Sequence, residues 1–161
     1  GDLTLDTNGI YLGGTGSANY LEDYEQGTFS PQFTDPSGGF VSGFGTRYGQ
    51  YTKVGNCVYI TIGLRNNTYS RTPSGAVLIS DLPFTSRDYH DDEESVFTIF
   101  CRLWGTGTPP KVAFCGNGIT NKLQLHMERY TGSNETFLDG SDFDTNSTCR
   151  IVLSGFYYTT D

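Results

Sequence analysis

Long apolar runs and helical periodicity are both missing from this sequence. No segment of about 18 consecutive apolar residues occurs, so no membrane-spanning helix is predicted. No long stretch repeats its apolar residues about every 3.6 positions, which argues against helix-bearing fold classes. The N-terminal residues lack the basic and apolar segments of a signal peptide. The sole methionine is Met127 and the chain begins inside a repetitive pattern, so we interpret it as the C-terminal part of a longer protein.

Basic charge is also scarce. Ten Lys and Arg residues stand against 18 Asp and Glu residues, which gives a formal net charge of −8. An acidic chain of this kind is not expected to bind nucleic acid or an anionic membrane. The charge fits a soluble protein outside the cell, and it would repel an anionic cell surface unless cations intervene.

The motifs that catalysis would need are absent. The chain has two histidines, His90 and His126. It lacks the G-x-S-x-G context of a nucleophilic serine and the repeats of the long parallel β-helices that carry tailspike-like glycan-cleaving enzymes. No pair of carboxylates stands out for glycan hydrolysis. We therefore expect a protein that is not an enzyme and that needs no cofactor.

Cysteine spacing of the metal-binding kind is missing as well. The four cysteines are Cys57, Cys101, Cys115 and Cys149. They include no C-x-x-C pair, and no histidine lies near them in the sequence. We expect buried free thiols that pack as small apolar side chains, with two disulfides as the alternative.

Glycine, aromatic residues and turn signals are abundant. The chain has 21 glycines, 11 tyrosines and 11 phenylalanines, a composition typical of an all-β protein with many turns. The stretch from Tyr48 to Arg65 indicates a β-hairpin, because Gly55 followed by Asn56 suits a tight turn between two β-rich runs. The return strand alternates with a period of two, which predicts one buried face formed by Val58, Ile60, Ile62 and Leu64.

Three later stretches also indicate strands. Ser95 to Trp104 is apolar on both sides for much of its length, which suits a strand between two layers. The residues from Asn121 to Arg129 alternate, with Leu123, Leu125 and Met127 expected inside. Thr148 to Thr160 is expected to form a long closing strand.

The fold class follows from about eight or nine such strands with frequent turn signals. We expect an all-β protein, an antiparallel two-sheet β-sandwich of jelly-roll type; a small closed barrel is the alternative. Residues 1–19 form a short N-terminal β appendage in this interpretation, and residues 20–161 form the sandwich.

Aromatic residues at strand ends and in polar loops are the candidate binding residues. Sugar recognition uses aromatic faces against the apolar side of the ring, with amides and carboxylates for the hydroxyl groups. Trp104 ends a strand just before a loop, which suits this role; a core or rim position is the alternative. The other candidates are Tyr69 and Arg71 in one polar loop, Tyr89 and His90 in a charged loop, and Tyr130 before a long loop.

Two acidic stretches are candidate metal sites. Asp139, Asp142 and Asp144 approach a D-x-D calcium pattern but lack its full spacing. His90 lies in an acidic loop whose carboxylates are not interrupted by glycine as in a calcium-binding loop. A solvated loop is the preferred interpretation, so no metal is expected.

Three stretches in order go beyond composition: LEDYEQGTFSPQF (Leu21–Phe33), RYGQYTKVGNCV (Arg47–Val58) and VLISDLPFTS (Val77–Ser86). In this order and spacing they resemble the distal domain at the C-terminal end of tail fibres and related virion proteins of tailed bacteriophages. The opening GDLTLDTNGIYLGG resembles the short β repeats that lead into such domains. The resemblance covers the first half of the chain, and from Tyr89 onward only the β pattern is similar.

The resemblance implies a homotrimeric domain of the virion, at or near the tip of a tail fibre. Such a domain attaches to the host cell surface, where it binds a glycan or a protein, without insertion into the membrane. Residues 1–19 would be the end of the fibre shaft. A purely structural trimerisation or capping domain, and a glycan-cleaving tailspike-type domain, are the alternatives.

A trimer would bring together three chains of like charge. Its contacts must therefore be apolar or screened by salt. Aromatic side chains on outward strand faces are the candidates for this surface, with Tyr59, Tyr157 and Tyr158 as examples.

Overall fold

The computed structural model describes residues 10–11, 20–21, 23–37, 44–66, 74–87, 95–102, 109–116, 119–131, 134–142 and 149–160. These residues form an all-β structure without an α-helix, in which one 3₁₀ turn, η2 (Gly140–Asp142), follows the eleventh strand. Within them, no helix is long and apolar enough to cross a membrane. The absence of helical periodicity in the sequence has its counterpart in this architecture.

The strands are β1 (Ile10–Tyr11), β2 (Tyr20–Leu21), β3 (Tyr24–Phe29), β4 (Gln32–Thr34), β5 (Phe44–Val54), β6 (Cys57–Asn66), β7 (Leu78–Ser80), β8 (Ser95–Arg102), β9 (Val112–Gly116), β10 (Ile119–Thr131), β11 (Asn134–Phe137) and β12 (Arg150–Tyr158).

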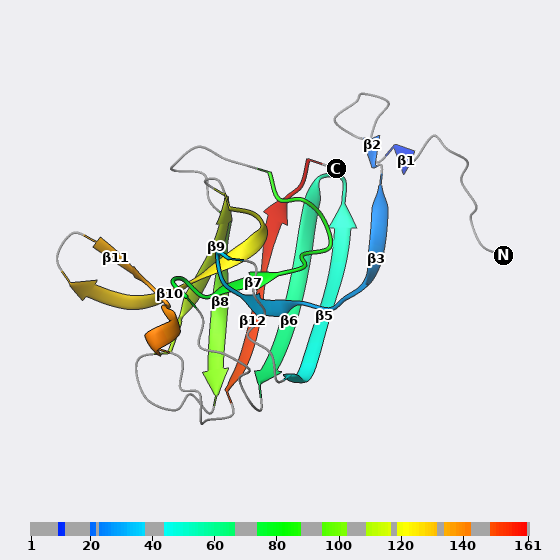
Figure 1. The fold of residues 1–161 in the computed structure, drawn as a ribbon. Coiled ribbons are helices and arrows are strands. Elements are labelled where there is room, and N and C mark those ends of the chain that lie inside the picture. Colours follow the sequence, from blue (N-terminus) through cyan, green and yellow to red (C-terminus); the bar gives the residue numbers. More distant parts are fainter. Residues whose placement is uncertain are drawn as a thin grey trace.

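The strands form two antiparallel layers. The first layer has the order β3-β5-β6-β12-β8-β9 and the second has the order β10-β7-β4, with β11 paired to β10. Figure 1 shows β7 of the second layer crossing in front of the first. Because β9 pairs with both β8 and β10, the hydrogen-bond ladder continues from one layer into the other. The sandwich is thus confirmed, whereas this strand order does not show a jelly-roll topology.

A separate two-stranded sheet lies near the beginning of the chain. There β1 pairs with β2, so that Ile10 is opposite Leu21 and Tyr11 is opposite Tyr20. The pairing joins residues on both sides of the division predicted after position 19. The acidic segment that begins at Tyr20 is therefore extended at its first two residues.

The central hairpin is confirmed. Strands β5 and β6 pair from Val54–Cys57 outward, and Gly55 at the turn has a φ of +57°, which glycine adopts without steric cost. The buried face of β6 is the predicted one, because Val58, Ile60, Ile62 and Leu64 are all at most 3% exposed. We call this side of the six-stranded layer the inner face, and the opposite side the outer face.

The core fills the space between the inner face and the second layer. Phe33 of β4, Ile79 of β7 and Leu123 of β10 are fully buried and face the apolar residues of the six-stranded layer. Each such side chain contributes about 1.5–3 kcal/mol when it leaves water. At Gly155 of β12 a side chain has no room, since a Cβ there would lie 2.5 Å from a ring carbon of Phe97.

The prediction that the strand beginning at Ser95 is buried on both sides is wrong. In β8 only the inner positions are covered, while Val96 and Phe100 are 63% and 65% exposed. The described part of the second layer lies against one face of β8 only. A run of apolar residues therefore does not by itself indicate burial on both sides.

The prediction that Tyr157 faces outward is also wrong. The period of two in β12 places it on the inner side with Leu153, and it is fully buried. Its hydroxyl donates to the carbonyl of Phe84 and accepts from the amide of the same residue, both at 3.2 Å. Tyr59 and Tyr158 do face outward, at 54% and 38% exposure.

All four cysteines are free thiols, as expected. Cys115 and Cys149 are buried, whereas Cys57 and Cys101 are partly buried. Burial, with a smaller contribution from Cys149, raises the pKa of the Cys101 thiol to about 12. This thiol also lies 3.3 Å from the carbonyl oxygen of Pro110. Cys101 thus behaves as a small, protonated side chain of the interior.

Candidate functional site

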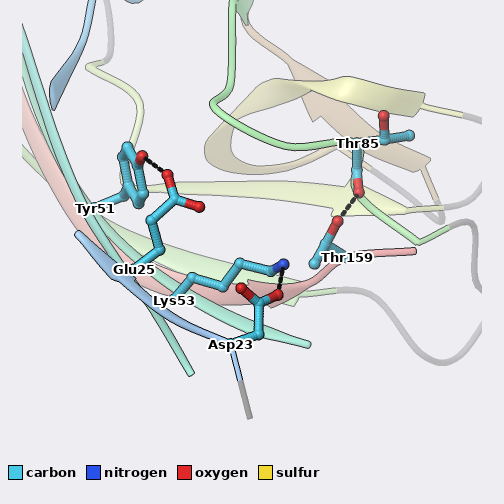
Figure 2. Close-up of polar contacts among 6 residues, drawn as sticks. All are labelled: Asp23, Glu25, Tyr51, Lys53, Thr85 and Thr159. Atoms are coloured by element: carbon cyan, nitrogen blue, oxygen red, sulfur yellow. Dashed lines mark hydrogen bonds and ion pairs between the residues drawn. The ribbon is translucent and has the colours of Figure 1, made fainter. Parts of the chain in front are cut away.

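The three stretches that carry the sequence resemblance meet on the inner face, at the β3–β5 edge. Lys53 of β5 forms an ion pair with Asp23, and its Nζ lies 4.9 Å from the ring centroid of Phe84. The lysine side chain is only 5% exposed, while that of Asp23 is 48% exposed. Figure 2 shows this pair beside Glu25 and Tyr51. The carboxylate and the ring together offset the cost of burying the ammonium group.

Tyr51, two residues before Lys53 on β5, makes a neighbouring polar contact on the inner face. The Tyr51 hydroxyl donates to the carboxylate of Glu25, and its ring meets Phe84 edge-on at 5.2 Å. This hydrogen bond is the main cause of a raised pKa of the Tyr51 phenol. Thr159 donates to the carbonyl of Thr85 at 2.7 Å, as Figure 2 also shows. These contacts hold the segment around Phe84 against the layer, so the motif residues have a structural role.

The outer face of the six-stranded layer carries a different feature, a shallow trough of about 660 Å³ across β3, β5, β6 and β12. Its outward side chains form two cross-strand rows. One row runs Gln26, Thr52, Tyr59 and Phe156, and the other runs Thr28, Gln50, Thr61 and Ser154. The residues between them, such as Gly27 and Gly155, also line the trough.

Aromatic rings line one end of the trough. The ring centroids of Tyr59 and Phe156 are 5.8 Å apart, and those of Phe156 and Tyr158 are also 5.8 Å apart. The pKa of the Tyr59 phenol is raised, first by the neighbouring Cys57 and its hydrogen bond and then by burial and Tyr158. The Tyr59 hydroxyl can both donate and accept a hydrogen bond.

Amides and hydroxyls make up the remainder of the trough, with no carboxylate or imidazole among the residues that line it. Gln26 and Gln50 offer donors and acceptors, and the threonine and serine hydroxyls do the same. Such a neutral surface beside aromatic rings can hydrogen-bond the hydroxyl groups of a sugar and stack on its apolar side. The chemistry that these side chains provide is binding.

Most candidate residues chosen from the sequence lie outside the described residues. These are Trp104, Tyr69, Arg71, Tyr89, His90 and Asp144. Tyr130 belongs to β10 of the second layer, and β10 does not contribute to the trough. The candidates therefore stay predictions, and the trough adds a site that they did not include.

Asp139 and Asp142 are hydrogen-bonded to each other across the 3₁₀ turn η2. The carboxylate of Asp142 accepts a hydrogen bond from the amide of Asp139 at 3.1 Å, and the amide of Asp142 donates to the carbonyl of Asp139 at 3.0 Å. Asp142 thus has a local role in the turn. In the part of the chain that the structure describes, no three His, Cys, Asp or Glu residues are grouped as metal ligands.

The trough residues lie within strands, whereas the sequence signals for binding are aromatic residues at strand ends and in loops. The two central strands of the trough belong to the predicted hairpin, whose register places Gln50 opposite Thr61 and Thr52 opposite Tyr59. The two outer strands of the trough, β3 and β12, pair with this hairpin from distant parts of the sequence.

In comparisons with known proteins, no protein-family model, no curated protein and no solved structure matches the chain.

Proposed function

We propose that this chain is the tip domain of a virion tail fibre and attaches the virion to the host surface by binding a glycan in the trough. The observation that carries the binding part is the combination of Tyr59 and Phe156 with neutral amides and hydroxyls on one open surface. The resemblance of the three sequence stretches to fibre-tip domains supports the assignment to a virion. The acidic chain and the homotrimer implied by that resemblance are compatible with this function.

Binding by the trough can be tested with matched phenylalanine variants. Phe156 in the trough and Phe137 in β11 are 43% and 40% exposed, so their truncation removes similar surface. Phe156→Ala should weaken binding to a panel of bacterial surface polysaccharides about tenfold or more, which corresponds to about 1.4 kcal/mol. Phe137→Ala should leave binding unchanged, with circular dichroism confirming the fold of both variants.

Tyr59 provides the second arm of this test. Tyr59→Ala removes the ring and the hydroxyl, whereas Tyr59→Phe removes the hydroxyl alone and keeps the stacking surface. We expect the alanine variant to bind more weakly than the phenylalanine variant. Unchanged glycan binding in both Phe156→Ala and Tyr59→Ala would refute the trough as the contact surface.

A structural trimerisation domain is the second candidate, and the apolar character of the outer face favours it. Eight of the nine large apolar side chains exposed among the described residues lie on that face: Tyr24, Tyr48, Tyr59, Val96, Phe100, Val112, Phe156 and Tyr158. Exposed apolar patches of this kind often mark protein interfaces. Sedimentation of the Tyr59→Ala and Phe156→Ala variants separates the two functions, since a loss of assembly mass would identify the trough as a subunit contact.

A further inference from the structure

Three arginines lie side by side on the outer face, at the opposite end of β6 from the hairpin turn. Arg150 of β12 is directly opposite Arg65 of β6 on one side and Arg102 of β8 on the other. All three are exposed, and the period of two places them on the same face as the trough. We call them the arginine row. Since neighbouring strands are about 4.8 Å apart, the row spans about 10 Å.

The arginine row is unfavourable for the isolated fold. Like charges directly opposite each other on neighbouring strands repel, and three of the ten basic residues of an acidic chain are placed in this one row. Within the described residues, none of the three guanidinium groups has an ion-pair partner. An anion bound across the row would relieve the repulsion, so the arrangement indicates a ligand of negative charge.

The surface between the arginine row and the trough is open. Gly63 is the outward residue between Thr61 of the trough and Arg65, and a Cβ at Gly63 would meet no atom within 4 Å. Its neighbours across the strands are Tyr48 and Val152. Thr61 and Arg65 are four residues apart, which is about 13 Å along a strand. One extended ligand can therefore reach from the trough to the row across the glycine.

We infer that the outer face binds an acidic glycan, with neutral sugar units in the trough and a carboxylate or phosphate group on the arginine row. This inference rests on the proposed function and specifies its ligand class. Guanidinium groups bind carboxylate and phosphate oxygens in pairs of parallel hydrogen bonds, which lysine does not do. At physiological salt the Debye length is about 8 Å, so the negative charge elsewhere on the chain is largely screened at the row. The net charge of −8 is therefore compatible with an anionic ligand.

The test uses the full chain with three polymer probes: a polyuronate, a phosphate-containing polysaccharide and a neutral glucan. We expect the wild type to bind one or both acidic probes more tightly than the neutral one, with an affinity that falls as salt rises. Arg150→Gln should lower the acidic-probe affinity about tenfold, as expected for loss of a charged hydrogen-bond donor. Arg87→Gln removes the same charge from an exposed position outside the row and is the control.

Arg150→Glu distinguishes a binding role from a structural one. A carboxylate between Arg65 and Arg102 replaces repulsion with attraction, so the melting temperature should rise while binding of the acidic probe is lost. A residue that merely supports the fold would lose stability and binding together. The carboxylate and phosphate arms of the probe set identify which anionic group the row accepts.

The outcomes separate this inference from the proposed function. Equal binding of neutral and acidic probes, unaffected by Arg150→Gln, would overturn the acidic-glycan inference and leave glycan binding standing. Failure of the wild type to bind any glycan would overturn both. A changed assembly mass in Arg150→Glu, with acidic-probe binding retained, would make the row a contact between copies of the chain and would also overturn the inference.

Discussion

The two faces of the six-stranded layer are built from the same strands but follow different rules. On the inner face, polar groups such as the ammonium of Lys53 and the hydroxyl of Tyr51 have partners, and the apolar side chains are covered. On the outer face, aromatic rings are open to solvent and arginines stand opposite arginines. Folding stability requires the covered and partnered side chains of the inner face. The exposed rings and opposed arginines of the outer face are tolerated only because the inner face stabilises the fold. Residues that cost stability without an evident structural benefit are therefore the ones to examine for function.

The comparison is tested most strongly by truncating one residue on each face of β6. Ile62→Ala removes a fully buried inner side chain and leaves a cavity, so the free energy of unfolding should fall by about 2–5 kcal/mol. Thr61→Ala, its exposed neighbour on the outer face, should change stability by no more than about 0.5 kcal/mol. Guanidinium chloride unfolding of both variants provides the measurement, and similar losses for the two would contradict the assignment of the faces.

Breaking the ion pair between Lys53 and Asp23 should destabilise the fold less, by an amount that depends on which partner is replaced. Asp23→Asn leaves the Lys53 ammonium buried without its counter-ion and should cost about 1–3 kcal/mol. Lys53→Met leaves Asp23, which is 48% exposed and hydrated by solvent, so it should cost less. The quantity to compare is the unfolding midpoint of the two variants. Greater destabilisation by Lys53→Met than by Asp23→Asn would show that the lysine is not held as described.

The pH dependence of stability reports on the inner position of Cys101. Its pKa is about 12 in the folded protein, because of burial and then Cys149, against an ordinary value of 9.0 when unfolded. As pH rises, the thiol therefore ionises first in the unfolded state. The contribution of the protonated thiol to the free energy of unfolding is complete below pH 9 and is lost between about pH 9 and pH 12. Unfolding of wild type and Cys101→Ser over this range should show a steeper decline for the wild type. In the folded protein, alkylation of Cys101 at pH 8 should be slow.

The smallest expected effect on stability is at Gly63. Gly63→Val adds a β-branched side chain where no atom lies within 4 Å, so the melting temperature should stay the same or rise slightly. Binding of an acidic polysaccharide that spans the trough and the arginine row should nevertheless weaken, because the new side chain stands in its path. Retention of full affinity together with an unchanged fold would show that the ligand does not cross this position.

Local signals in the sequence were sufficient for the central hairpin. The Gly55–Asn56 turn and the alternation from Val58 to Leu64 determine its register without reference to the rest of the chain. The all-β class and the two layers also followed from composition and turn frequency. The reversed face of Tyr157 and the one-sided burial of β8 were not anticipated, because both depend on where the second layer lies.

The arginine row and the trough could not be found in the sequence for a related reason. Arg65, Arg102 and Arg150 are isolated residues in the sequence, and only the pairing of β12 between β6 and β8 brings them into line. The trough likewise needs β3 and β12 on either side of the hairpin. Long-range strand pairing is not encoded in any short window, so a surface built from it becomes visible only in the folded chain.

The position of β12 also has a consequence for how the protein is made. Because β12 lies between β6 and β8 but follows both in the sequence, the ribosome releases those two strands before the strand that joins them. Until β12 emerges, β6 and β8 each have an edge with unpaired amides and carbonyls that a neighbouring nascent chain could join. Synthesis that stalls before Arg150 should therefore yield aggregates rather than a smaller folded protein.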